Sequence, residues 1–167
     1  MNYEKLKERI LQAVNTRPLD FEAYNDMFAL CREYEQEQFA TAHEWNQTFR
    51  VDIGLALRYA VDKGDFQVAE RFNDLLFRSL VFGAPHFFDD YLQAVEFGKP
   101  LDKKFYQPRR HYLKRYVDAY QEILDGKLDF LSISMPKRGG KSQLGINFTN
   151  MLSGKFPDRS TLMEGTG

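Results

Sequence analysis

The sequence predicts an α/β protein: a helical N-terminal region over residues 1–100, followed over residues 101–167 by the first strand–helix–strand unit of an incomplete parallel sheet. Two observations support this fold class. Apolar residues recur at helical spacing through the first hundred residues, with caps and breaks between the runs. After Pro100, an apolar run, a glycine-rich turn, a helical run and a second apolar run follow one another, which is the order of a βαβ unit.

Five helices are expected in the first hundred residues. Asp20 is placed to cap the second helix, and Asp65 to cap the fourth. The third is expected to begin at Thr41, because Glu44 follows at the spacing of a capping box. The residues expected on the apolar faces of the first four helices are Tyr3, Leu6, Ile10 and Val14, then Phe21, Tyr24, Phe28 and Cys31, then Trp45, Phe49 and Ile53, and then Phe66, Ala69, Phe72 and Leu76. The fifth helix is expected to run through Phe87, Phe88, Tyr91, Leu92 and Val95.

Composition limits the class of protein. Of the 167 residues, 43% are apolar and 28% are charged, as in soluble globular proteins. The single cysteine, Cys31, excludes an internal disulfide and is consistent with a reducing, cytoplasmic setting. No run approaches the roughly 18 apolar residues of a membrane span, and the first residues do not form a secretory signal. We therefore expect a protein that is neither membrane-spanning nor exported.

Charge is distributed unevenly along the chain. Residues 1–100 contain 11 lysines and arginines against 17 acidic residues, whereas residues 101–167 contain 12 against 7. A basic segment of this kind is expected where a polyanion binds. The alternative is that most of these cations only solvate helix faces.

The second region begins with the basic-aromatic segment at residues 105–110. An expected helix follows, with Leu113, Val117, Tyr120 and Leu124 inward, and residues 128–134 have the composition and length of a strand. Another expected helix runs through Leu144, Phe148, Met151 and Leu152, and a second strand is expected at Ser160–Met163.

Between the first strand and its helix lies the segment Met135–Ser142, which reads MPKRGGKS. It matches the phosphate-loop pattern GxxxxGK[ST] except at the first position, where Met135 replaces glycine. In such a loop the glycines let backbone N–H groups approach phosphates, the lysine carries charge to the β- and γ-phosphates, and the hydroxyl coordinates Mg²⁺. The predicted ATP-binding residues are Pro136, Lys137, Arg138, Gly139, Gly140, Lys141, Ser142 (also the Mg²⁺ ligand) and Gln143. The alternative is a glycine-rich turn that binds nothing.

The stretches FYQPRRHYL and DGKLDFLSISMPKRGGKS resemble the start of the ATPase domain in the terminase large subunits of tailed bacteriophages. The resemblance covers about residues 100–167. In that family the loop often lacks its first glycine and carries an arginine before the glycine turn, as Arg138 does here. Lys137 departs from the pattern, because close relatives often have a proline there.

The resemblance implies roles for particular residues. Arg138 would act on the γ-phosphate with Lys141 as a catalytic residue, although a simple ground-state phosphate contact is the alternative. Tyr106, Gln107 and Arg109 occupy the stretch that typically holds the adenine, although Gln107 could be a surface residue. Arg110 could pair with a carboxylate of a neighbouring helix instead of binding nucleotide.

The resemblance also implies the function of the whole protein: an ATPase, dependent on ATP and Mg²⁺, that drives double-stranded viral DNA into a procapsid, with a metal-dependent endonuclease elsewhere in the full-length chain. Its partners would be viral DNA, the portal protein, the terminase small subunit and further copies in a ring, in the cytoplasm of the bacterial host. The Mg²⁺-binding acid and the catalytic glutamate of such a motor cannot be placed, so the chain is expected to be an N-terminal portion that is inactive by itself. The alternatives are another P-loop NTPase, such as a helicase or kinase, and a non-catalytic nucleotide- or DNA-binding module.

Overall fold

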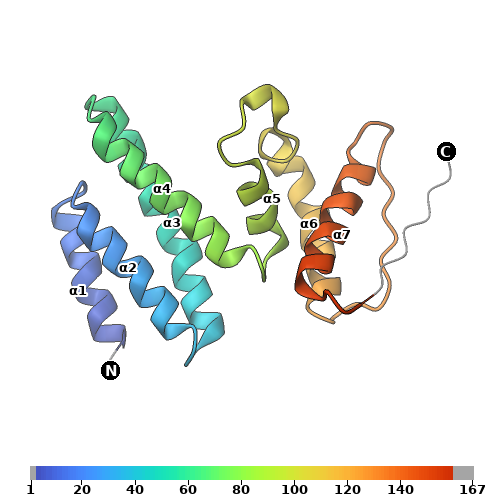
Figure 1. Ribbon diagram of the computed structural model, residues 1–167, viewed down its shortest axis with the longest axis horizontal. Coiled ribbons are helices and arrows are strands. Elements are labelled where there is room, and N and C mark those ends of the chain that lie inside the picture. Colours follow the sequence, from blue (N-terminus) through green and yellow to red (C-terminus); the bar gives the residue numbers. More distant parts are fainter. Residues whose placement is uncertain (1–2, 160–167) are drawn as a thin grey trace. The chain divides into compact units, whose positions relative to one another are not determined.

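The computed structural model describes residues 3–159 of the chain (Figure 1). Over this range the protein is helical and contains no β-strand, so the predicted α/β class is wrong. The described residues form two compact units, which divide between Phe82 and Gly83. The helices are α1 (Tyr3–Thr16), α2 (Phe21–Tyr34), α3 (Phe39–Asp62), α4 (Phe66–Gly83), α5 (Phe88–Glu96), α6 (Arg110–Leu124) and α7 (Lys141–Lys155), with short 3₁₀ turns η1 (Leu101–Lys103) and η2 (Gln107–Arg109).

The first unit is built from α1 to α4 around an aromatic core. α1 packs on α2, and α2 packs on α3. The fully buried ring of Phe72 on α4 meets the edge of Tyr24 on α2, with ring centroids 4.9 Å apart. Most of the residues predicted to face inward are in this core, and Phe66, at the start of α4, is an exception that is largely exposed. No described helix has the length and apolar character required to cross a membrane.

The helix starts of the first unit test the predicted caps. Asp65 acts as predicted, because its Oδ1 accepts the backbone N–H of Val68 at 3.1 Å. Asp20 stands at the N-cap of α2, but its side chain makes no capping hydrogen bond. The capping box expected at Thr41 does not mark the start of a helix, because α3 begins two residues earlier at Phe39.

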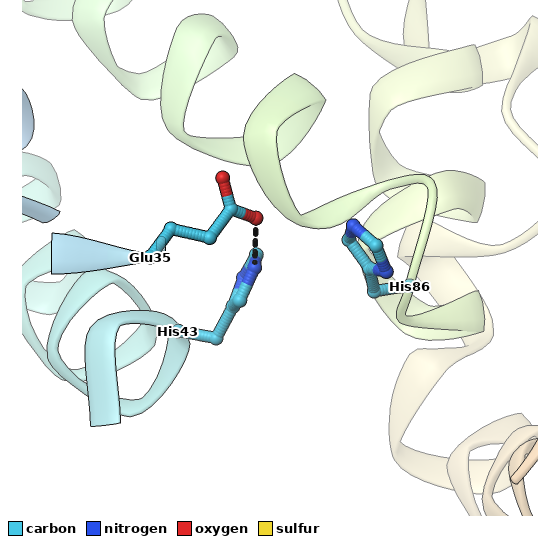
Figure 2. Close-up of side chains that lie close together, drawn as sticks. All are labelled: Glu35, His43 and His86. Atoms are coloured by element: carbon cyan, nitrogen blue, oxygen red, sulfur yellow. Dashed lines mark hydrogen bonds and ion pairs between the residues drawn. The ribbon is translucent and has the colours of Figure 1, made fainter. Parts of the chain in front are cut away.

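A buried histidine joins two parts of the first unit. His43 on α3 is 1% exposed, and its Nε2 lies 2.8 Å from Oε1 of Glu35 at the end of α2 (Figure 2). Its ring stacks on that of Phe82, with centroids 4.4 Å apart. His43 is therefore a core residue of the first unit.

The second unit packs α5, α6 and α7 together. Its core contains Phe88 and Leu92 from α5, Leu113 and Val117 from α6, and Leu144, Phe148 and Met151 from α7, with Tyr106 from the loop before α6. The sequence places the boundary between its two regions at residue 100. In the structure α5 packs on α6 and α7, so the second unit includes it.

The predicted strand at 128–134 is an extended segment that joins α6 to α7. Leu131 and Ile133 are half-buried and alternate with the exposed Ser132 and Ser134, as side chains on a strand do. A β-strand also requires a second strand whose backbone pairs with it through hydrogen bonds, and the described residues contain no such strand. The second predicted strand, Ser160–Met163, lies outside the described residues.

Candidate phosphate-binding loop

The loop at 135–140 ends where α7 begins. The backbone N–H of Gly139 donates to the carbonyl of Pro136 at 2.9 Å, which closes a tight turn. Arg138 has φ +65° and Gly140 has φ +100°, so two residues of the loop are left-handed. Left-handed residues in a turn let neighbouring N–H groups face one side, an arrangement that binds anions.

Neither glycine of the turn has room for a side chain. A Cβ on Gly139 would lie 2.9 Å from the carbonyl oxygen of Pro136. A Cβ on Gly140 would lie 2.5 Å from Cε2 of Phe105, and the left-handed backbone there is itself unfavourable for a residue with a side chain. Both glycines are therefore required by the folded loop, independently of any ligand.

Met135, in place of the first glycine of the motif, has a structural role. Its side chain is half-buried and packs against the core of the second unit. It also lies against the turn, because its Cβ is 3.4 Å from the position that a Cβ on Gly139 would take. Its backbone is not left-handed, so no glycine is needed at this position.

A hollow of 530 Å³ is lined by every residue from Met135 to Gln143, together with Ile146. All eight predicted ATP-binding residues are therefore brought to one surface. Three of them, Lys137, Arg138 and Lys141, are cations with exposed side chains, and no residue that lines the hollow is acidic. Such a surface attracts polyanions.

The start of α7 adds to this attraction. Gly140 is the N-cap, and Lys141, Ser142 and Gln143 form the first turn of a helix of 15 residues. The free N–H groups and the dipole of a helix N-terminus favour an anion at this end. The Ser142 hydroxyl is exposed on the same surface and has the hard oxygen donor that suits Mg²⁺.

A second hollow of 320 Å³ also reaches Lys141. Its other lining residues are mostly apolar: Tyr120 and Ile123 of α6, Leu131 and Ile133 of the extended segment, and Phe148 of α7. This composition does not suit phosphate, so the cationic hollow is the candidate site.

The segment at 105–107 lies beside the loop, where it is held by a carboxylate that sequence reasoning missed. Oε1 of Glu96 accepts the backbone N–H groups of Phe105 at 2.8 Å and Tyr106 at 2.6 Å, and Oε2 accepts that of Gln107 at 3.0 Å. Glu96 is only 5% exposed. The signal available in the sequence is weak: Glu96 is an acidic residue in the last turn of a helix, where the dipole disfavours it.

Tyr106 faces the protein core. Its side chain is fully buried, and its hydroxyl donates a hydrogen bond to Asp89 of α5. Arg110 donates two hydrogen bonds, of 3.0 and 2.8 Å, to the same carboxylate. Burial, and then the hydrogen bond to Asp89, raise the pKa of Tyr106. Burial acts to raise the pKa of Asp89, but the hydrogen bonds from Arg110 and Tyr106 outweigh it and leave that pKa lowered.

Two other residues of the basic-aromatic segment at 105–110, Gln107 and Arg109, remain accessible. Gln107 is half-buried and its Oε1 accepts a hydrogen bond from Lys104 at 2.6 Å, whereas Arg109 is exposed with its guanidinium 5.6 Å from the centre of the Phe105 ring. Arg110 pairs with a carboxylate of a neighbouring helix, the alternative that its sequence context left open. Gln107 and Arg109 therefore keep side-chain groups that a nucleotide base could reach, but Tyr106 does not.

Comparison of the chain with protein-family models, with curated proteins and with solved structures finds no match.

Proposed function

We propose that residues 135–143 bind the phosphates of ATP with Mg²⁺, and that the chain is the N-terminal portion of a DNA-packaging ATPase, a terminase large subunit. The observation that carries the proposal is a hollow lined by every residue of the phosphate-loop motif. Its lining includes three cations and no carboxylate, and it lies at the N-terminus of α7.

Each residue of the loop has a role in this proposal. Gly139 and Gly140 keep the turn narrow enough for backbone N–H groups to approach phosphate oxygens. Lys141 would place its ammonium group beside the β- and γ-phosphates, and Ser142 would give its hydroxyl to Mg²⁺. Pro136, Lys137 and Gln143 complete the wall of the hollow.

Arg138 is the proposed catalytic cation, together with Lys141. A non-glycine residue in the left-handed region costs free energy, and such residues persist where the surrounding structure or function requires them. The left-handed backbone of Arg138 supports a functional role for this position. A guanidinium can bind two phosphate oxygens at once and stabilise the charge that develops during phosphoryl transfer.

The wider proposal, ATP-driven packaging of double-stranded viral DNA together with a portal protein, a small terminase subunit and further copies of the same chain, rests on the resemblance of residues 100–167. The basic character of that region supports a polyanionic partner. A helicase, a kinase and a non-catalytic nucleotide-binding module would use the same loop. ATP turnover that double-stranded DNA and procapsids stimulate would favour the packaging motor over these alternatives.

The binding test uses the purified chain, Mg²⁺ and a fluorescent ATP analogue, with ATP, GTP and inorganic triphosphate as competitors. Lys141→Ala is expected to weaken binding by about tenfold or more, because a charge-assisted contact to phosphate is lost. The matched control is Lys155→Ala, which removes an exposed lysine from the last turn of the same helix. If the wild-type chain binds none of these compounds, or if the two variants bind equally well, the phosphate site is not at this loop.

A further inference from the structure

Glu96 closes a loop of the second unit. It is the last residue of α5, and its carboxylate reaches across residues 97–104 to accept three consecutive backbone N–H groups, those of residues 105–107. A buried carboxylate needs such donors, and hydrogen bonds to an ionised acceptor are stronger than those between neutral groups. The backbone at 105–107 is therefore fixed at three points by one side chain.

The fixed segment presents Phe105 to the phosphate loop. The ring of Phe105 occupies the space that a side chain at position 140 would need, since two of its carbons lie 2.5 and 2.6 Å from an ideal Cβ there. Gly140 is the left-handed residue that joins the loop to α7. The ring thus lies against the backbone at the point where the loop becomes a helix.

We propose that Glu96 is a positioning residue for the phosphate loop: it holds Phe105 against Gly140, and so keeps the loop in the conformation that receives the phosphates of a nucleoside triphosphate. The inference rests on the proposed function of the loop, and it adds a residue that lies outside the motif. Glu96 touches no nucleotide in this proposal and acts through Phe105.

Two features favour this role over simple closure of a loop. Asp89 already anchors the segment to α5 through the side chains of Tyr106 and Arg110, so the segment has a separate attachment. Glu96 accepts a hydrogen bond from the backbone N–H of Phe105, the residue whose ring touches Gly140. It therefore holds the backbone from which that ring projects, whereas Asp89 is bonded to the side chains of Tyr106 and Arg110.

The experiment measures Mg²⁺–ATP affinity for the wild-type chain, Glu96→Gln, Phe105→Ala and the double variant. Glu96→Gln is the mild change, because the amide keeps one oxygen but presents an NH₂ group to the backbone N–H of one residue in the segment. If the competent loop conformation falls to about a tenth of the population, the apparent Kd rises about tenfold. Asp125→Asn is the control, since this carboxylate bonds Gln121 and Lys127.

The double variant separates positioning from general stability. If Glu96 acts through Phe105, the double variant binds ATP no more weakly than Phe105→Ala alone, because the two residues form one route to the loop. Losses that add, or a Glu96→Gln chain that unfolds at a lower temperature yet binds ATP as well as the wild type, would overturn the inference.

Failure of the inference can be told apart from failure of the proposed function. A wild-type chain that binds no nucleotide defeats the proposed function. If the wild-type chain binds ATP, Lys141→Ala abolishes binding and Glu96→Gln keeps the wild-type affinity, only the positioning role is defeated.

Discussion

The ring of Phe105 fills the space beside Gly140, so that a Cβ at position 140 would lie 2.5 Å from its Cε2 atom. The contact joins two segments that are far apart in the sequence, the basic-aromatic stretch and the phosphate loop. It also makes position 140 sensitive to substitution for two separable reasons, steric overlap and backbone conformation.

Gly140→Ala is expected to destabilise the second unit by about 1–3 kcal/mol, because alanine is strained at a left-handed φ and its Cβ meets the Phe105 ring. The free energy of unfolding in urea and the rate of hydrogen exchange of the α7 amides measure this loss of stability. Gly154→Ala is the control on the same helix, where a Cβ has open space and no left-handed φ. It is expected to be neutral or slightly stabilising. Equal stability of the two variants would contradict the described loop geometry.

Arg138→Gly is expected to raise the stability of the fold by about 1 kcal/mol, because glycine adopts φ +65° without strain. The same change removes a cation from the hollow and is expected to weaken ATP binding. Parallel unfolding and binding measurements would show a more stable protein with a poorer site. A loss of stability would show that the guanidinium makes contacts that support the fold.

Arg138→Lys addresses catalysis, and its test requires the protein assembled as a packaging motor. Lysine keeps the charge but loses the planar group that can bind two oxygens. We expect ATP affinity within a few-fold of normal and a hydrolysis rate lowered by roughly 10³-fold or more. Single-turnover hydrolysis beside ATP affinity measures both. A normal rate with weakened affinity would assign Arg138 to nucleotide binding alone.

Asp89 is expected to make the second unit sensitive to acid. Its folded-state pKa is lowered, since the hydrogen bonds from Arg110 and Tyr106 outweigh burial. The stability that it contributes is therefore present above its ordinary pKa of about 4 and is lost as the pH falls below that value, through the lowered pKa. Asp89→Asn should flatten this part of the stability profile, whereas Asp129→Asn, in the exposed chain after α6, removes the same charge as a control. An unchanged profile in Asp89→Asn would contradict the role of the ion pair.

Gln107 and Tyr106 are expected to affect different properties. Tyr106→Phe removes the hydroxyl that bonds Asp89, and should lower stability by about 1 kcal/mol without changing the preference for ATP over GTP. Gln107→Ala should reduce that preference if its amide reads the base. Competition binding with ATP and GTP on both variants is the measurement. A changed preference in Tyr106→Phe alone would place the buried residue nearer the nucleotide than the structure does.

Local pattern predicts the helices well, because amphipathic spacing and breaks such as residues 63–65 act within a few residues of each other. The composition and length of residues 128–134 predict a strand, and in the structure Leu131 and Ile133 are half-buried between exposed neighbours. A ladder depends on a second segment, which local pattern does not specify.

The candidate site is likewise predictable from the sequence only in part. The sequence motif identifies the residues that line the hollow, because they are contiguous. It does not reveal Glu96, since the contacts of that residue depend on how the chain returns after residues 97–104. Tyr106 was placed beside the adenine by resemblance, and its burial against Asp89 could be seen only once α5 and α6 were packed.

Met135 changes which positions define this loop. Because its half-buried side chain packs against the apolar core and its backbone is not left-handed, the first position of the motif suits a bulky apolar residue here. The demand for glycine falls entirely on positions 139 and 140. A search template that insists on glycine at the first position would pass over such a loop, whereas one that accepts a bulky apolar residue followed by a paired-glycine turn would retain it.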